Sequence, residues 1–146
     1  MSKVLVIHGP NLNLLGTREP AIYGYESLED VAERCRAIGA ELGMEIEFRQ
    51  SNYEGQIVGW IQEAIGTADA IVINAAAYTH TSVAIYDALK SYHGLKIELH
   101  ISHPHLRESF RHVSYVSPVV DAMVAGLGTN GYSHVVEMLP DLLAKA

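Results

Sequence analysis

Apolar residues along the chain form two alternating patterns. Short apolar runs are typical of strands buried in a parallel sheet, and apolar residues spaced by three or four positions are typical of helices with one buried face. The predicted strands are Val4–Ile7, Glu45–Phe48, Ala70–Ile73, Leu95–Leu99 and Met123–Leu127. The predicted helices cover 28–42, 57–65, 82–89 and 135–143.

Turn and cap signals separate these elements. Gly9 and Pro10 end the first strand, and Gly43 ends the first helix. Ser27 followed by Asp30 is typical of a helix N-cap. Strands that alternate with helices predict a parallel sheet with helices on both faces. The 146 residues show no repeats or linkers, so we expect one catalytic domain over 1–146 with an α/β, flavodoxin-like, doubly wound five-stranded fold.

In folds of this kind, ligands bind beyond the carboxyl ends of the strands. The segments in that position are 8–25, 50–53, 74–81 and 100–112. Functional residues are therefore expected in these four segments.

Composition narrows the class of protein. Hydrophobic residues make up 49% and charged residues 18% of the chain, which is typical of a globular protein. The net charge of -7 disfavours nucleic acid as a partner, so an anionic substrate needs a locally basic pocket. Cys35 is the only cysteine, and no signal peptide or apolar run of ~20 residues is present. We therefore expect a cytoplasmic protein that does not span a membrane.

Residues 126–131 spell Gly-x-Gly-x-x-Gly between a predicted strand and a predicted helix, as in dinucleotide-binding proteins. That site also needs a further βα unit with an acidic residue about 20 positions on, and the chain ends at Ala146. We expect these glycines to pack the last strand against the last helix, without a nucleotide cofactor.

Three histidines, His100, His103 and His105, lie close together in the sequence. A metal-dependent hydrolase is therefore one alternative. Glu98 lies two residues before His100, so both side chains point to the same side of a strand. A carboxylate beside a histidine orients and charges a general acid, and we favour this interpretation over a metal site.

The segment 9–24 is longer than a plain connection between a strand and a helix, and loops of this length are often functional lids. It contains Arg18 and Tyr23. A phenol has a pKa of ~10 and is a poor base at neutral pH unless a cation stabilises the phenolate, as Arg18 would do for Tyr23. A packing role for the tyrosine is the alternative.

Two further segments carry polar groups suited to a hydroxylated acid. Asn74–Ser82 supplies an amide, an imidazole and hydroxyls, with Ser82 also placed to cap the next helix. Arg107 and Arg111 are expected to share one face of a short helix and to bind a carboxylate. The helix at 82–89 has more apolar positions than one core-facing stripe needs, which favours contact with a partner subunit.

Five stretches resemble type II 3-dehydroquinate dehydratase in order and spacing. They are Gly9–Gly24, Gln50–Gly55, Asn74–Ser82, Glu98–Ser102 and Arg107–His112. The resemblance implies a hydro-lyase that converts 3-dehydroquinate to 3-dehydroshikimate through an enolate, in the shikimate pathway of aromatic biosynthesis or in quinate catabolism. It also implies no cofactor and no metal.

The resemblance implies a role for each matching residue. Tyr23 would be the base, as tyrosinate, and Arg18 would lower its pKa and help to close the site. Asn11 would hold a water that stabilises the enolate. His100, oriented by Glu98, would protonate the leaving hydroxyl.

The resemblance also implies how the substrate is bound. Asn74, Ile101 and Ser102 would hold the carboxylate region. His80 and Arg111 would bind the ring hydroxyls.

Assembly and sequence departures complete the comparison with the family pattern. Asp87 would reach the site of a neighbouring copy, because the family forms trimers that assemble into dodecamers, and a homododecamer is expected here. The positions that differ from the common pattern are His8, Ala75–Ala76, Tyr86, His103–Pro104 and Val113. None of these removes a catalytic role. A non-catalytic flavodoxin-like interaction module is the remaining alternative.

Overall fold

The strands form one sheet in which neighbouring strands run parallel. The computed structural model describes residues 1–17 and 19–146, with the side chain of Tyr23 outside the described part. The sheet order is β2-β1-β3-β4-β5. The strand bounds are β1 Ser2–His8, β2 Met44–Gln50, β3 Ala70–Asn74, β4 Leu95–His100 and β5 Ala122–Ala125. This order is the flavodoxin-like one, so the predicted fold class is confirmed.

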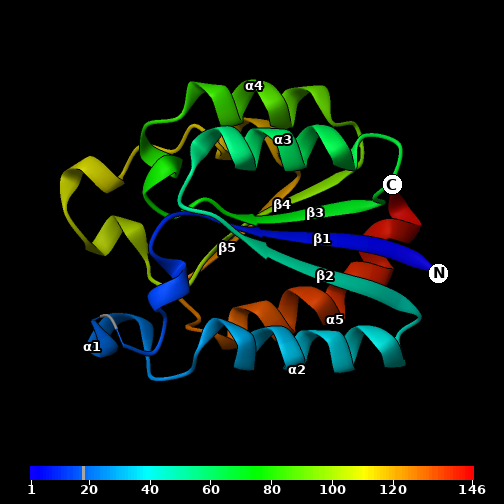
Figure 1. The fold of residues 1–146 in the computed structure, drawn as a ribbon, viewed down its shortest axis with the longest axis horizontal. Coiled ribbons are helices and arrows are strands. Elements are labelled where there is room, and N and C mark those ends of the chain that lie inside the picture. Colours follow the sequence, from blue (N-terminus) through cyan, green and yellow to red (C-terminus); the bar gives the residue numbers. More distant parts are fainter. Residues whose placement is uncertain (18) are drawn as a thin grey trace.

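Helices cover both faces of the sheet (Figure 1). One face carries α2 (Leu28–Glu41) and α5 (Asn130–Lys145), and the other carries α3 (Glu54–Ala64) and α4 (Val83–Ser91). The connections contain α1 (Pro20–Tyr23) and the short 3-10 helices η1 (Leu12–Leu14), η2 (Ala76–His80), η3 (Pro104–Leu106), η4 (Ser109–Arg111) and η5 (Ser117–Val119). Within the described chain, none of the helices has the length and apolar character needed to cross a membrane.

Successive residues of β1 face opposite halves of the core. Val4 and Val6 belong to the cluster packed under α2 and α5, whereas Leu5 and Ile7 belong to the cluster under α3 and α4. All four are buried. A strand covered on both faces has no polar side, which explains the continuous apolar run in the sequence.

Side-chain caps begin two of the helices where they were predicted. The Ser27 hydroxyl accepts from the Asp30 amide at 3.1 Å, and the Asp30 carboxylate accepts from the Ser27 amide at 3.1 Å. At the start of α4, the Ser82 hydroxyl accepts from the Ile85 amide at 2.9 Å. Both predicted N-caps are confirmed.

The fifth strand ends at Ala125, two residues earlier than predicted. Gly126 and Gly128 have φ angles of 85° and 64°, a conformation that favours glycine, and they turn the chain out of the sheet. Gly131 is buried beside Val124 of β5. The expected packing role therefore applies to Gly131, whereas the first two glycines form the turn.

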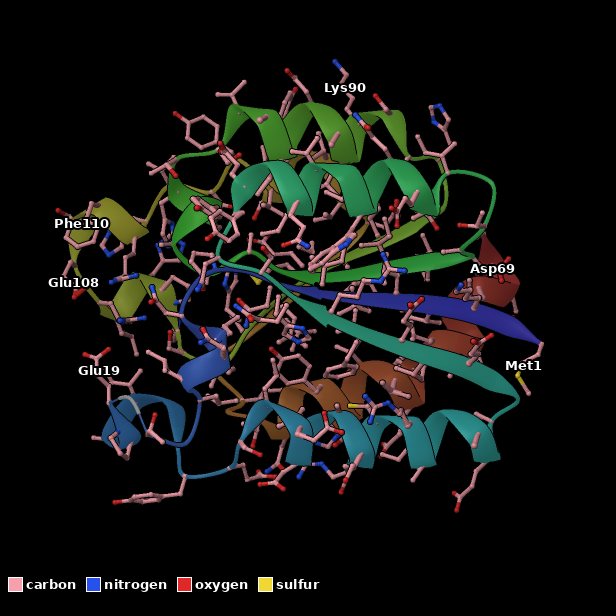
Figure 2. The ribbon with its side chains drawn as sticks, viewed as in Figure 1. Met1, Glu19, Asp69, Lys90, Glu108 and Phe110 are labelled. Carbon is pink, nitrogen blue, oxygen red and sulfur yellow. The ribbon has the colours of Figure 1, made fainter. Side chains whose placement is uncertain are left out.

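The carboxyl ends of the strands meet at one end of the molecule (Figure 2). Glu19, Glu108 and Phe110 lie at this end, and Met1 and Asp69 lie at the opposite end. The connections that follow β1, β3 and β4 are therefore close together in space, as the sheet topology requires.

His8, the last residue of β1, is a buried histidine that is held neutral. Its Nδ1–H donates to the Arg49 carbonyl at 3.0 Å, and its ring lies 4.9 Å from that of Phe48 and 5.4 Å from that of Tyr132. Burial lowers the pKa of His8 to about 4, although the hydrogen bond to Arg49 acts in the opposite direction. The fold therefore disfavours the protonated ring.

We expect His8 to make the free energy of unfolding fall by about 2 kcal/mol between pH 7 and pH 5. The unfolded chain binds the proton near pH 6.5 and the folded chain near pH 4, so stability is lost as the pH falls through this window. In His8→Asn, this part of the pH dependence should disappear in urea unfolding measured at both pH values. His134→Asn, at an exposed site on α5, is the matched control. Equal pH dependence in His8→Asn and the wild type would contradict the prediction.

Candidate active site

A cavity of about 230 Å³ lies at the carboxyl ends of β1, β3 and β4. Its walls come from the loops that follow these three strands, as the fold predicts. Seven of the predicted site residues line it: Asn11, Asn74, His80, His100, Ile101, Ser102 and Arg111. These seven predicted site residues therefore lie around one cavity.

A close approach of two loops positions Asn11. A Cβ on Gly9 would lie 2.2 Å from the Ala75 carbonyl oxygen, so only glycine allows the loops after β1 and β3 to pass so closely. The Gly9 amide donates to the Asn74 carbonyl at 2.8 Å. Asn11 has a φ of 70°, and its amide donates to the Asn52 side-chain oxygen at 3.0 Å. The loop after β2 thus holds Asn11 in a conformation that few residues adopt.

Midway along the predicted lid, the backbone at Gly16 comes into close contact with Tyr25, just beyond the end of the lid. A Cβ on Gly16 would lie 2.7 Å from the Tyr25 carbonyl oxygen, and Gly16 has a φ of 94°. The segment between them contains α1, which ends at Tyr23. Arg18 lies outside the described residues, as does the side chain of Tyr23, so the predicted contact between these two side chains is not described.

A partly buried arginine network anchors Glu26, which lies just beyond the predicted lid. Arg34 donates to the Glu26 carboxylate at 2.6 Å and to the Thr129 carbonyl at 3.2 Å. The Thr129 hydroxyl donates to the other Glu26 oxygen at 2.6 Å. This hydrogen bond and the Arg34 guanidinium hold the pKa of Glu26 below its usual range. The lid is therefore tied to the turn between β5 and α5.

Glu98 and His100 form a buried pair, and His100 lines the cavity. Both belong to β4, and the distance from Glu98 Oε2 to His100 Nε2 is 2.5 Å. The prediction that they lie on the same side of the strand is confirmed. Because Nε2 faces Glu98, Nδ1 is the ring nitrogen available to another partner.

Two serines that the sequence analysis missed complete the surroundings of Glu98. Ser114 donates to Glu98 Oε2 at 2.9 Å, and Ser117 donates to Oε1. Burial alone would raise the pKa of Glu98, but the hydrogen bonds from His100, Ser117 and Ser114 hold it below its usual range. Because the two serines are far from Glu98 in the sequence, the sequence pattern gave no sign of these contacts.

Asn74 is oriented by a tyrosine from the last helix. Its Nδ2 donates to the Tyr132 hydroxyl at 3.0 Å, and its Oδ1 accepts from the Ala76 amide at 3.2 Å. Burial raises the pKa of Tyr132, so its hydroxyl stays protonated. Tyr132 was also missed, although a tyrosine on the apolar face of a helix generally needs a hydrogen-bond partner.

The prediction that Arg107 and Arg111 share one helix face is wrong. Arg107 follows η3 in an extended conformation, and Arg111 ends η4, so the two are on separate turns. Both nevertheless line the cavity. Arg107 donates to the Ser102 hydroxyl at 3.2 Å, and Arg111 pairs with Glu108 at 2.5 Å. They give the cavity the positive charge that an anionic substrate requires.

His80 and Asp87 differ in their relation to the site. His80 Nδ1–H donates to the Val113 carbonyl at 2.7 Å, and burial lowers the pKa of its ring. Asp87 is exposed on α4 and does not line the cavity of its own chain. On α4, Ile85, Ala88 and Leu89 are buried in the core, whereas the apolar side chain of Val83 is exposed.

The histidine cluster has the geometry of ring contacts. The His103 and His105 rings are 6.1 Å apart and perpendicular, and the His105 and His112 rings are 5.1 Å apart. In the part of the chain that the structure describes, no three histidine, cysteine or acidic side chains are arranged to hold a metal ion. The Glu98–His100 pair, a carboxylate bonded to an imidazole, is an arrangement suited to acid–base chemistry.

Known proteins that resemble this chain give a consistent result. The family model described as "Dehydroquinase class II" matches residues 2–140. A 3-dehydroquinate dehydratase of Bartonella henselae is 54% identical over 136 residues, which cover 93% of this chain and 92% of that protein. One of Cereibacter sphaeroides is 55% identical over 141 residues, covering 97% and 96%.

Solved structures agree with the sequence relatives. The crystal structure of a type II dehydroquinase from Butyrivibrio crossotus has a TM-score of 0.92 at 48% identity, covering 95% of this chain and 97% of that one. That of Propionibacterium acnes has a TM-score of 0.93 at 43% identity, covering 97% of each chain. Since the family model spans nearly the whole sequence and relatives share more than half of their residues with it, the chain belongs to the class II dehydroquinase family.

Proposed function

We propose that this chain is a type II 3-dehydroquinate dehydratase, a hydro-lyase that forms 3-dehydroshikimate by acid–base chemistry within the described cavity. The observation that carries the proposal is the buried Glu98–His100 pair, whose histidine lines a cavity that also contains two arginines. A hydroxylated substrate with one carboxylate matches a site that combines a histidine for acid catalysis with cationic groups and amides. The direct test is to mix the protein with 3-dehydroquinate and to follow the ultraviolet absorbance of the conjugated product.

The reaction begins with removal of a proton from the carbon next to the substrate ketone. Tyr23 is the base, as a phenolate, and the Arg18 guanidinium lowers its pKa. This assignment rests on membership of the family and on the location of both residues in the long segment between β1 and α2. Asn11, at the cavity wall, holds the water that stabilises the enolate oxygen.

The second step expels the hydroxyl group as water. His100 protonates this leaving group from Nδ1, because its Nε2 is engaged by Glu98. To donate from Nδ1 while Nε2–H donates to Glu98, the ring must carry a proton on both nitrogens. After one turnover, Tyr23 carries the proton from carbon and His100 has lost one proton. Exchange with solvent then returns both residues to their starting protonation states.

Substrate binding divides between the two sides of the cavity. Asn74, Ile101 and Ser102 hold the carboxylate region, with Arg107 supplying charge through its contact with Ser102. His80 and Arg111 bind the ring hydroxyls. All of these residues line the cavity, which supports a binding role for each of them.

We further propose a homododecamer, a tetramer of trimers, in which Asp87 reaches the cavity of a neighbouring copy. Asp87 is exposed and lies away from the cavity of its own chain, which is compatible with such a role. In a closed ring of identical subunits, each copy both gives and receives this carboxylate.

The first prediction concerns the base. Tyr23→Phe should lower kcat by orders of magnitude while the substrate still binds, because proton transfer in the transition state is lost. Arg18→Ala should have nearly the same effect. Tyr25→Phe, at an exposed position of the same segment, is the control and should keep the wild-type kcat. A normal kcat in Tyr23→Phe would rule out the assignment of the base.

The second prediction concerns the acid. His100→Ala should abolish dehydration, yet exchange of the substrate α-proton with solvent deuterium should continue, because Tyr23 still forms the enolate. His105→Ala is the control, since a metal-dependent hydrolase would need that histidine and the acid–base reaction does not. Complete loss of exchange in His100→Ala would argue against separate base and acid steps. Loss of wild-type activity after thorough chelation would favour the metal-dependent alternative.

The third prediction links assembly to activity. Asp87→Ala and Tyr23→Phe proteins should each be inactive, and dissociating and reassembling an equal mixture should restore roughly a quarter of the wild-type activity. The restored sites combine an intact Tyr23 with an intact Asp87 from the neighbour. The same mixture without dissociation is the control. If the mixture contains hybrid oligomers by mass spectrometry and remains inactive, Asp87 does not act across the boundary.

A further inference from the structure

The segment after η4 brings two serine hydroxyls against the buried carboxylate. Ser114 donates to Glu98 Oε2 at 2.9 Å, and Ser117 donates to Oε1. Neither serine lines the substrate cavity. Both line a second cavity of about 300 Å³, to which Glu98 and His100 also contribute. The serines therefore contact Glu98 from the second cavity, outside the lining of the first.

The direction of the Ser114 hydrogen bond is fixed by its other partners. Its hydroxyl oxygen accepts from the Val116 amide at 3.1 Å and from the Ser117 amide at 3.0 Å. Both lone pairs of this oxygen are then used, so the hydroxyl hydrogen points toward the remaining partner, Glu98. The backbone turn at 114–117 thus makes Ser114 a donor to the carboxylate.

Glu98 consequently receives three donors from the described side chains. Oε2 accepts from His100 Nε2 and from Ser114, and Oε1 accepts from Ser117. Hydrogen bonds of this kind favour the ionised carboxylate and fix its orientation. By orienting the carboxylate, these hydrogen bonds also keep Nε2 of His100 facing Glu98, so that Nδ1 faces away from it.

We propose that Ser114 and Ser117 are positioning residues for the acid step, holding Glu98 as an ionised carboxylate aligned with His100. This inference rests on the proposed function, because it assigns the two serines to the second step of that reaction. The remaining charged and titratable groups around the second cavity are His80, His103, His105, Arg111 and His112. Arg111 is paired with Glu108, and His80 is bonded to the Val113 carbonyl.

Single alanine substitutions test the role of each hydroxyl. Ser114→Ala and Ser117→Ala should each lower the kcat of dehydration about tenfold, the scale expected for loss of a hydrogen bond to a charged group. KM should stay near its wild-type value, since neither serine lines the substrate cavity. Exchange of the substrate α-proton with solvent deuterium should persist, so its ratio to dehydration should rise. General damage to the site would lower both rates together.

Matched variants separate the hydroxyl from other effects of substitution. Ser109→Ala changes an exposed serine in the same part of the chain and should leave kcat unchanged. Ser117→Thr keeps a hydroxyl and should recover most of the wild-type kcat. If an alanine variant does not fold by circular dichroism, the corresponding cysteine variant, which keeps the volume and weakens the donor, takes its place.

A double-mutant cycle with Glu98 gives the decisive comparison. In a Glu98→Gln background, Ser117→Ala should cause little further loss of kcat, because the serine acts through the carboxylate that is already absent. Independent, multiplicative losses would overturn the inference, as would alanine variants with the wild-type ratio of exchange to dehydration. Failure of the proposed function has a different signature, since the wild type itself would then give no turnover of 3-dehydroquinate.

Discussion

The buried carboxylate of Glu98 needs hydrogen-bond partners, and this requirement organises the active-site end of the molecule. Only 1% of this residue is exposed, and a buried charge without partners would cost several kcal/mol. The structure meets this requirement with His100 from the same strand and with two serines from the segment that leads into β5. The path of the chain between β4 and β5 is therefore tied to the chemistry of the pair.

Close backbone packing imposes a second constraint on the same end. The loop after β1 passes against the loop after β3 at a distance that only Gly9 permits, and both loops line the cavity. Asn52 from the loop after β2 holds Asn11, and Tyr132 from α5 holds Asn74. The backbone of Asn11 and the side-chain amide of Asn74 are thus each held by a residue that does not line the cavity, and the site is built on the sheet rather than on one flexible loop.

Regular patterns made most of the fold predictable from the sequence. The buried strands, the caps at Ser27 and Ser82 and the shared side of Glu98 and His100 all follow from local periodicity or local hydrogen bonding. The single helix expected for Arg107 and Arg111 was wrong, because the chain is extended between two short turns. The Ser114, Ser117 and Tyr132 contacts depend on distant segments meeting in space, which periodicity does not report. The site roles themselves came from resemblance to a family, and the local pattern alone left a metal site open.

The positions of the glycine-containing turns explain why a nucleotide-like motif serves another purpose here. In a dinucleotide-binding fold, the glycine-rich turn follows the first strand and lets the backbone approach a pyrophosphate. In this chain it follows β5, where Gly126 and Gly128 turn the backbone and Thr129 bonds to Glu26 at the end of the lid. The turn after β1 instead brings Asn11 to the cavity that His100 of β4 also lines. The strand ends of this sheet thus bring asparagine, histidine and arginine side chains to one cavity, a combination suited to the proposed acid–base chemistry.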